Sequence, residues 1–190
     1  MTSVSGQVVL RVDTPDGCIA VEQLGDAAAS STIVFLHGLT ANRTTWRPVA
    51  RLLGEEYRLL LVDSLARGES DPAPHARFDL EAEAIRLACA LSECAVEKPI
   101  LAGHSHGAAV AVAAAARVGA RGLLLASPVT PDVVRPGLLR HLESPIASAL
   151  MPPITTLFRR ALTRYMLVRR VFTGEAGLPT GAVERYAAPW

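Results

Sequence analysis

The chain has 190 residues, of which 50% are hydrophobic and 19% are charged, and its formal net charge is +1 at pH 7. This length fits one domain with a sizeable core, and the near-neutral charge gives no sign of the basic surface that nucleic-acid binding uses. No stretch stays apolar for about 18 residues without a charge or proline, and the N-terminus does not read as a signal peptide. The odd set of cysteines, Cys18, Cys89 and Cys94, is expected to act as small buried hydrophobes in a cytoplasmic protein.

The first part of the chain alternates strand and helix patterns. Residues 7–25 predict two antiparallel strands joined by a turn at Pro15-Asp16-Gly17. Four later apolar runs predict strands buried in a mostly parallel sheet: Thr32–Gly38, Arg58–Ser64, Pro99–Ser105 and Gly122–Pro128. Helical spacing separates these runs, over residues 44–56 (with Thr45 as the N-cap), 79–97 and 106–119. The order predicts a doubly wound α/β sheet, within a core domain formed by residues 1–130.

Residues 131–190 show helical periodicity and prolines but no clear strand pattern. Residues 154–168 carry an apolar stripe, and five arginines occupy much of the remaining surface up to residue 170. We interpret this segment as a helical cap or lid over a pocket, with the arginines in solvent. The alternative is a helix that lies on a membrane surface. A partly exposed stripe would also favour self-association.

The sequence Gly103-His104-Ser105-His106-Gly107 lies between a predicted strand and a predicted helix. A serine hydroxyl is a weak nucleophile, and it needs exposure, a base and a prepared site for the oxyanion. A sharp strand-to-helix turn exposes the hydroxyl but crowds the backbone, so small flanking residues are required. The alternative is a helix N-cap serine between two glycines that serve packing. We predict that Ser105 is a nucleophile with strained backbone dihedral angles.

Three segments resemble the α/β-hydrolase family in its common bacterial form. They are IVFLHGLTANRTTW, which is similar to the third strand and oxyanion loop, LLLVDSLARGES, which is similar to the fourth strand and its D-x-R-G-x-G-x-S loop, and LAGHSHG, which is similar to the nucleophile elbow. The resemblance covers residues 5–130 well and the remaining segment loosely. It implies an α/β-hydrolase-type sheet and a serine hydrolase that cleaves an ester or related acyl bond through an acyl-enzyme.

The resemblance also implies roles for individual residues. Ser105 matches the nucleophile, and the backbone N–H groups of Leu39 and His106 match the oxyanion hole. The side chain of His37 is expected to form structural hydrogen bonds beneath the site, and His104 and His106 are expected not to act as the base. Asp63, which ends the fourth strand, matches a structural aspartate. Gly68 and Ser70 match the following loop, whereas residues 65–67 depart from its pattern.

The acid and the base of a catalytic triad are not evident in the sequence. The family order places an acid and then a histidine after the nucleophile. Beyond Gly107 the chain contains one aspartate, Asp132, and one histidine, His141, and neither follows a predicted seventh or eighth strand. Asp132 as acid and His141 as base are therefore weak candidates. The expectation is that the chain lacks its C-terminal portion, and that a fluorophosphonate gives little or no labelling of Ser105 because no positioned base is evident.

Two functional hypotheses remain open from the sequence. The first is a serine hydrolase acting on a small-molecule acyl substrate. The second is a hydrolase-like fold without catalysis that serves as a binding or interaction module. No dinucleotide fingerprint, phosphate-binding loop or metal-ligand motif is visible, so we expect neither a cofactor nor a metal.

Overall fold

The computed structural model describes residues 8–54 and 56–129, together with residues 161, 164 and 183. The chain divides into two compact units, Met1–Val129 and Thr130–Trp190. The first unit carries the fold and the site considered below. The assignment of residues 131–190 as a cap or lid falls almost entirely outside the described residues and stays a prediction.

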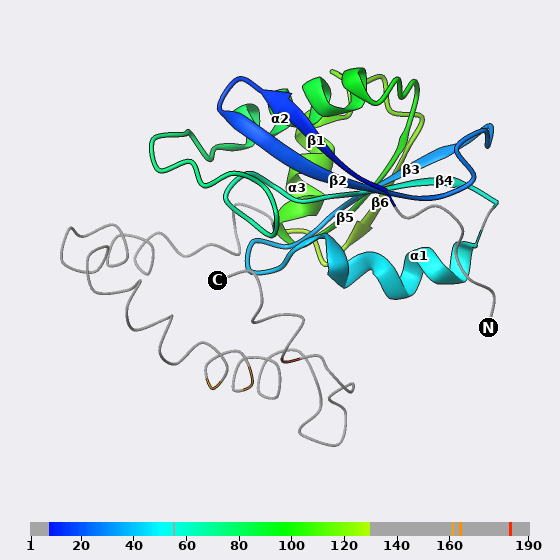
Figure 1. Cartoon of the computed structure of the whole chain (residues 1–190), viewed down its shortest axis with the longest axis horizontal. Coiled ribbons are helices and arrows are strands. Elements are labelled where there is room, and N and C mark those ends of the chain that lie inside the picture. Colours follow the sequence, from blue (N-terminus) through cyan, green and yellow to red (C-terminus); the bar gives the residue numbers. More distant parts are fainter. Residues whose placement is uncertain (1–7, 55, 130–160, 162–163, 165–182, 184–190) are drawn as a thin grey trace. The chain divides into compact units, whose positions relative to one another are not determined.

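A six-stranded mixed sheet forms the centre of the described unit (Figure 1). Its strands are β1 (Val8–Thr14), β2 (Gly17–Gly25), β3 (Thr32–Leu36), β4 (Arg58–Val62), β5 (Ile100–His104) and β6 (Gly122–Ala126). They lie in the order β1-β2-β4-β3-β5-β6, with β1, β2 and β4 paired antiparallel and β4, β3, β5 and β6 paired parallel. The predicted antiparallel entry and parallel-dominated sheet are confirmed.

Helices cover both faces of the sheet. On one face, α2 (Leu80–Glu93) and α3 (His106–Ala114) pack over a core that includes Val34 and Leu36 of β3. On the other face, α1 (Arg47–Leu53) and Trp46 pack over a core that includes Phe35. Alternate residues of β3 therefore enter different cores, which explains why its sequence is apolar throughout.

The prediction that all four later strands are buried is wrong for β6. Its leucines, Leu123, Leu124 and Leu125, are 40%, 57% and 42% exposed. In the described sheet β6 pairs only with β5, so one of its edges has no strand neighbour there. An apolar run predicts a strand, but it does not reveal whether the strand lies at the centre or the edge of a sheet.

The first helical segment begins differently from the prediction. Asn42, not Thr45, provides the cap, because its Oδ1 accepts a hydrogen bond from the Thr44 N–H at 3.0 Å. A 3₁₀ turn, η1 (Arg43–Trp46), follows this cap and leads directly into α1, which has a proline in its first turn. The start of α2 agrees with its acidic sequence, since Asp79 accepts a hydrogen bond from the Ala82 N–H at 3.1 Å.

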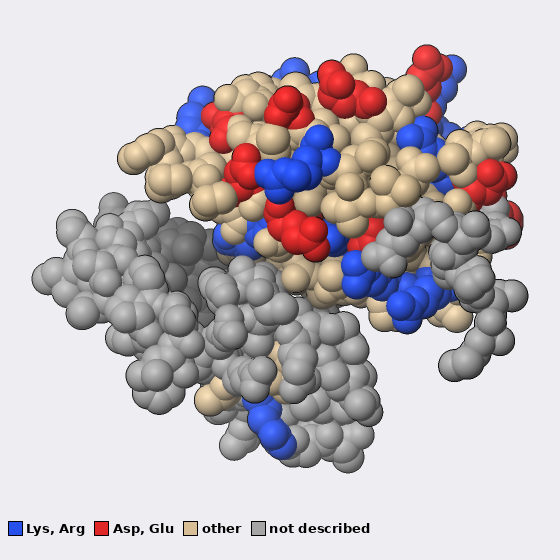
Figure 2. Space-filling view, viewed as in Figure 1, with Lys and Arg blue, Asp and Glu red and all other residues tan. Residues whose placement is uncertain are grey.

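Charge is mixed over the surface of the described unit. Figure 2 shows acidic and basic side chains interspersed on the visible face, without a broad patch of one sign. Among the described residues, no helix is both long enough and apolar enough to cross a membrane.

Candidate active site

Ser105 occupies the turn that joins β5 to α3. Its φ of 54° and ψ of −116° place it in the left-handed region, where a residue with a side chain is strained by about 1–3 kcal/mol. Its N–H donates to the Ala126 carbonyl at 2.9 Å, which ties the turn to β6. Within the described part of the chain, the Ser105 hydroxyl has no hydrogen-bond partner. The location and the strained backbone agree with the prediction from the sequence.

The two glycines around Ser105 are required by close backbone packing. A Cβ added to Gly103 would lie 2.5 Å from the N and Cα atoms of Ala108, and closer still to the Gly107 carbonyl oxygen. A Cβ added to Gly107 would lie 2.5 Å from the His37 carbonyl oxygen. These obstacles are backbone atoms, which cannot move aside as a flexible side chain can. The prediction that the turn needs small flanking residues is therefore confirmed.

The amides of Leu39 and His106 are both available for a ligand. Neither N–H donates a hydrogen bond to any acceptor among residues 8–54 and 56–129. The two residues line a common cavity of about 60 Å³. Gly38 approaches the serine from the same loop, because a Cβ added to it would lie 3.5 Å from Ser105 Cβ. The convergence of both N–H groups on one substrate oxygen stays a prediction.

His37 supports the loop that carries Leu39. The Ser64 N–H donates to His37 Nε2 at 3.0 Å, so the ring proton lies on Nδ1, which donates to the Gly38 carbonyl at 2.7 Å. Burial lowers the pKa of His37 and keeps the ring neutral. The Ala41 N–H also donates to the Gly38 carbonyl, at 3.0 Å. The Gly38 carbonyl and the Leu39 N–H belong to one peptide unit, in which the C=O and N–H point in opposite directions. The two bonds to the carbonyl therefore leave the Leu39 N–H pointing away from His37 and Ala41. The structural role predicted for His37 is confirmed.

A buried ion cluster fixes the two loops beside the site. Asp63 is fully buried and accepts hydrogen bonds from the N–H groups of Arg43 at 2.7 Å and Glu69 at 3.0 Å. The Arg43 guanidinium also pairs with Asp63, and its Nε donates to Glu22 at 3.2 Å. Arg47 donates to the same glutamate at 2.9 Å. The predicted structural role of Asp63 is confirmed, whereas its arginine partner was not predicted.

The loop after β4 reaches the loop that carries Leu39 in spite of its unusual sequence. Ala66 has a φ of 59°, a conformation that favours glycine. A Cβ added to Gly68 would lie 2.5 Å from Oδ1 of Asp63 and closer still to the other carboxylate atoms, so this glycine is required. Arg67 donates from Nε to the Leu39 carbonyl at 2.9 Å. Arg67 thus lines the cavity beside Leu39 and His106, a position that the family pattern did not indicate.

The described residues do not provide Ser105 with a base. Burial lowers the pKa of both His104 and His106, and neither ring hydrogen bonds to Ser105. The candidate base His141 and the candidate acid Asp132 lie outside the described residues, so the structure neither joins them to Ser105 nor separates them from it. The described part of the chain holds no group of three or more histidine, cysteine, aspartate or glutamate residues that could bind a metal.

The cysteines differ in part from the expectation. Cys94 is buried, but Cys18 and Cys89 are only half-buried. Cys18 lies at the start of β2, and its Sγ donates to Asp13 Oδ1 at 2.7 Å. None of these thiols lines the cavity beside Leu39 and His106.

Comparisons with known proteins agree with this geometry. N-formylmaleamate deformylase from Pseudomonas putida is 32% identical over 105 residues, which cover 55% of this chain and 39% of the relative. The 2-hydroxy-6-oxononadienedioate/2-hydroxy-6-oxononatrienedioate hydrolase from Cupriavidus pinatubonensis is 37% identical over 90 residues, which cover 45% of this chain and 31% of the relative. The chain thus spans well under two thirds of the length of these curated relatives.

A solved structure and a family model extend the likeness to most of the chain. Cfl2 from Burkholderia cenocepacia superposes with a TM-score of 0.77 at 24% identity, covering 96% of this chain and 64% of that protein, which shows a shared fold. The model of the alpha/beta hydrolase family matches residues 33–190. Because this match takes in far more than half of the sequence, the chain belongs to the alpha/beta hydrolase family.

Proposed function

We propose that the protein is a serine hydrolase in which Ser105 attacks the carbonyl carbon of an ester or related acyl bond and forms an acyl-enzyme. The observation that carries this proposal is the strained backbone of Ser105 between β5 and α3, with its hydroxyl unbonded among the described residues. Strain of this kind persists where the surrounding structure enforces it, and it is concentrated at functional sites. A helix dipole that begins at the next residue favours the negative charge of the tetrahedral intermediate.

The amides of Leu39 and His106 are the proposed donors to that intermediate. Both are free of acceptors in the described unit and both residues line the same cavity. His37 and Arg67 hold the carbonyl groups on either side of the Leu39 N–H, through bonds of 2.7 and 2.9 Å. Donors that are fixed before the reaction need not reorganise when charge develops, and loss of one such donor costs about 10²–10³ in kcat.

The base and the acid of the proposed reaction are assigned from the sequence alone. His141 and Asp132 are the histidine and the aspartate that follow residues 103–107 in the chain. The proposed reaction uses no cofactor. The names of the relatives, a deformylase and a hydrolase of dicarboxylic compounds, support small carbonyl compounds as the substrate class.

A second candidate function is a binding module with the hydrolase fold but without catalysis. The observation that favours it is the absence of a base in contact with Ser105 among the described residues. Such a module would keep the cavity and the free amides but would not react through Ser105. A covalent probe distinguishes the two functions.

The test is prolonged incubation with excess fluorophosphonate, followed by mass spectrometry of the intact protein and its peptides. We expect slow labelling, confined to Ser105, because the proposed oxyanion site has no base beside Ser105 among the described residues. Ser105→Ala should abolish the labelling, and the exposed control Ser92→Ala should leave it unchanged. Equal labelling of the wild type and Ser105→Ala would contradict the proposed nucleophile. Fast labelling that is lost in His141→Ala would assign the base to His141.

A further inference from the structure

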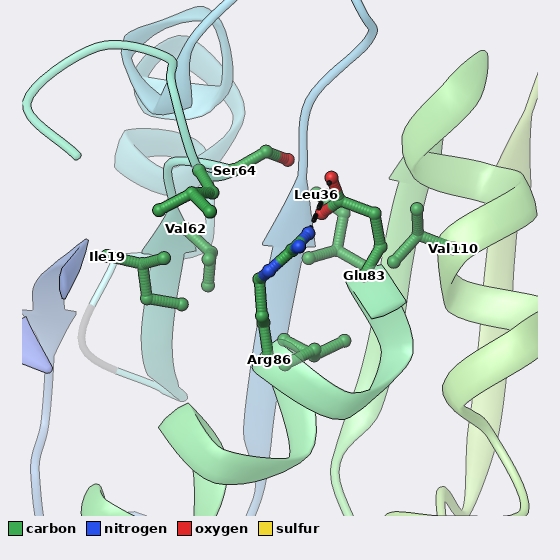
Figure 3. Close-up of a pocket in the computed structure, with 9 residues that line it drawn as sticks. Ile19, Leu36, Val62, Ser64, Glu83, Arg86 and Val110 are labelled. Carbon is green, nitrogen blue, oxygen red and sulfur yellow. Dashed lines mark ion pairs between the residues drawn. The ribbon is translucent and has the colours of Figure 1, made fainter. Parts of the chain in front are cut away.

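Two adjoining cavities extend from the oxyanion amides into the unit between the sheet and α2. The outer cavity, of about 60 Å³, is the one lined by Leu39 and His106. The inner cavity, of about 10 Å³, is lined mostly by apolar side chains, with Ser64, Glu83 and Arg86 as its polar lining (Figure 3). Both are lined by Ser64, Leu65 and Glu83. Glu83 therefore lies where the outer cavity meets the inner one.

The Glu83 carboxyl group is buried but has no hydrogen bond within the described residues. Glu83 belongs to the first turn of α2 and is 6% exposed. Its nearest cationic partner is Arg86, with 3.4 Å between Oε1 and Nη1. Burial raises the pKa of Glu83, and the charges of Arg86 and Arg67 oppose this shift. A carboxylate can accept several hydrogen bonds, so the Glu83 oxygens keep the capacity to accept one from a group in the cavity as well as pairing with Arg86.

Arg86 contributes an unused donor at the inner cavity. Its side chain is 2% exposed, and Asp16 accepts from its Nε at 2.9 Å and from its Nη2 at 2.6 Å. In contrast, Nη1 is buried and makes no hydrogen bond to the described residues. The close-up shows this guanidinium directed toward Glu83 (Figure 3). A space of about 10 Å³ holds roughly one water molecule, which is too little for a larger group.

Arg67 presents further donors to the outer cavity. Its Nε and Nη1 donate to the carbonyl groups of Leu39 and Ala66, whereas its Nη2 has no acceptor in the described unit. Arg67 and Glu83 both line the outer cavity but do not approach within ion-pair distance of each other. The outer cavity thus has an unpaired donor on one side and a hydrogen-bond acceptor on the other.

These charges select the kind of group that the cavity can accept. Glu83 repels an anion, and the two guanidinium groups repel a cation. A neutral group that both donates and accepts hydrogen bonds satisfies Glu83 and an arginine together, as a hydroxyl or a primary amide does. We propose that Glu83 and Arg67 form a subsite in the outer cavity for a neutral hydroxyl or primary amide group on the acyl part of the substrate, with Arg86 held beside Glu83 by their ion pair. This inference rests on the proposed function for the identity of its ligand as a substrate.

The test measures binding without catalysis, using the Ser105→Ala protein. Four probes of similar size are titrated by ¹H–¹⁵N NMR: propionamide, 1-propanol, propionate and propylammonium. We expect propionamide and 1-propanol to bind at least about tenfold more tightly than the two ions, because an unpaired buried polar group carries a large penalty. Shifts should centre on the amides of Leu39, Arg67 and Glu83.

Matched variants identify the residues responsible. Glu83→Met should weaken propionamide binding at least about tenfold, whereas Glu81→Met, an exposed neighbour in the same helical turn, should leave it unchanged. Arg67→Met should also weaken binding, without altering α2. Equal binding of all four probes, tighter binding of propionate, or equal affinities for the two glutamate variants would overturn the subsite.

The outcome is separable from the proposed hydrolase activity. Glu83-dependent binding of propionamide together with no labelling of Ser105 would retain the subsite and remove the hydrolase. Labelling of Ser105 together with equal binding of the four probes would retain the hydrolase and remove the subsite.

Discussion

Replacing Gly103 by alanine perturbs the turn that presents Ser105. The added Cβ would lie 2.5 Å from the N and Cα atoms of Ala108, so α3 would have to move away from β5. Overpacking in a core lowers the free energy of unfolding by about 1–3 kcal/mol. Because the atoms in the way are backbone atoms, we expect a loss near the upper limit, at ~3 kcal/mol. For a domain of this size, that loss lowers Tm by about 6–12 °C.

Gly122→Ala is the matched control for this substitution. Gly122 begins the neighbouring strand β6, and a Cβ added there would meet only Ile100, at an ordinary 3.9 Å. Thermal unfolding of both variants, followed by circular dichroism, should show a large loss for Gly103→Ala and almost none for Gly122→Ala. Equal Tm values would refute the close approach of strand and helix on which the site depends.

Four further predictions concern the residues around the site and the sheet edge. Asp63→Asn should destabilise the fold by about 3 kcal/mol in urea denaturation, because it leaves the buried Arg43 short of a counter-charge. Ala66→Gly should raise stability by about 0.5–1 kcal/mol in the same assay, since it relieves strain at a φ of 59°. Burial holds the pKa of His37 below its ordinary value of 6.5, so the folded state binds fewer protons than the unfolded state. The free energy of unfolding should therefore be highest above pH 6.5 and fall as the pH drops below it. His37→Asn should reduce this fall, measured by denaturation curves at about pH 7.5 and 5.5. We propose self-association through the exposed edge strand β6, so Leu124→Lys should lower the mass measured by light scattering at high protein concentration.

The sequence predicted the features that depend on local pattern. Continuous apolar runs identified the strands, and the glycines around Ser105 identified the turn, because both signals come from neighbouring residues. The structural roles of His37 and Asp63 followed from the resemblance to a family. The exposure of β6 does not follow from its own sequence, since an apolar strand has the same pattern at the centre or the edge of a sheet.

The polar groups around the cavity depend on distant contacts and were missed for that reason. Glu22 is a charged residue in β2, and its partner Arg43 begins η1, beyond the next strand. Glu83 and Arg86 lie in a helix with an acidic first turn, and both side chains are buried. A charged residue within an apolar stripe was the available signal, but it did not indicate the partner.

The crystal structure of the protein after reaction with a small fluorophosphonate tests the central claim most directly. We predict a covalent bond between phosphorus and Ser105 Oγ, with the phosphoryl oxygen accepting hydrogen bonds from the N–H groups of Leu39 and His106 at about 3 Å. An adduct on another residue, or a phosphoryl oxygen that turns away while these two amides bond elsewhere, would contradict the account.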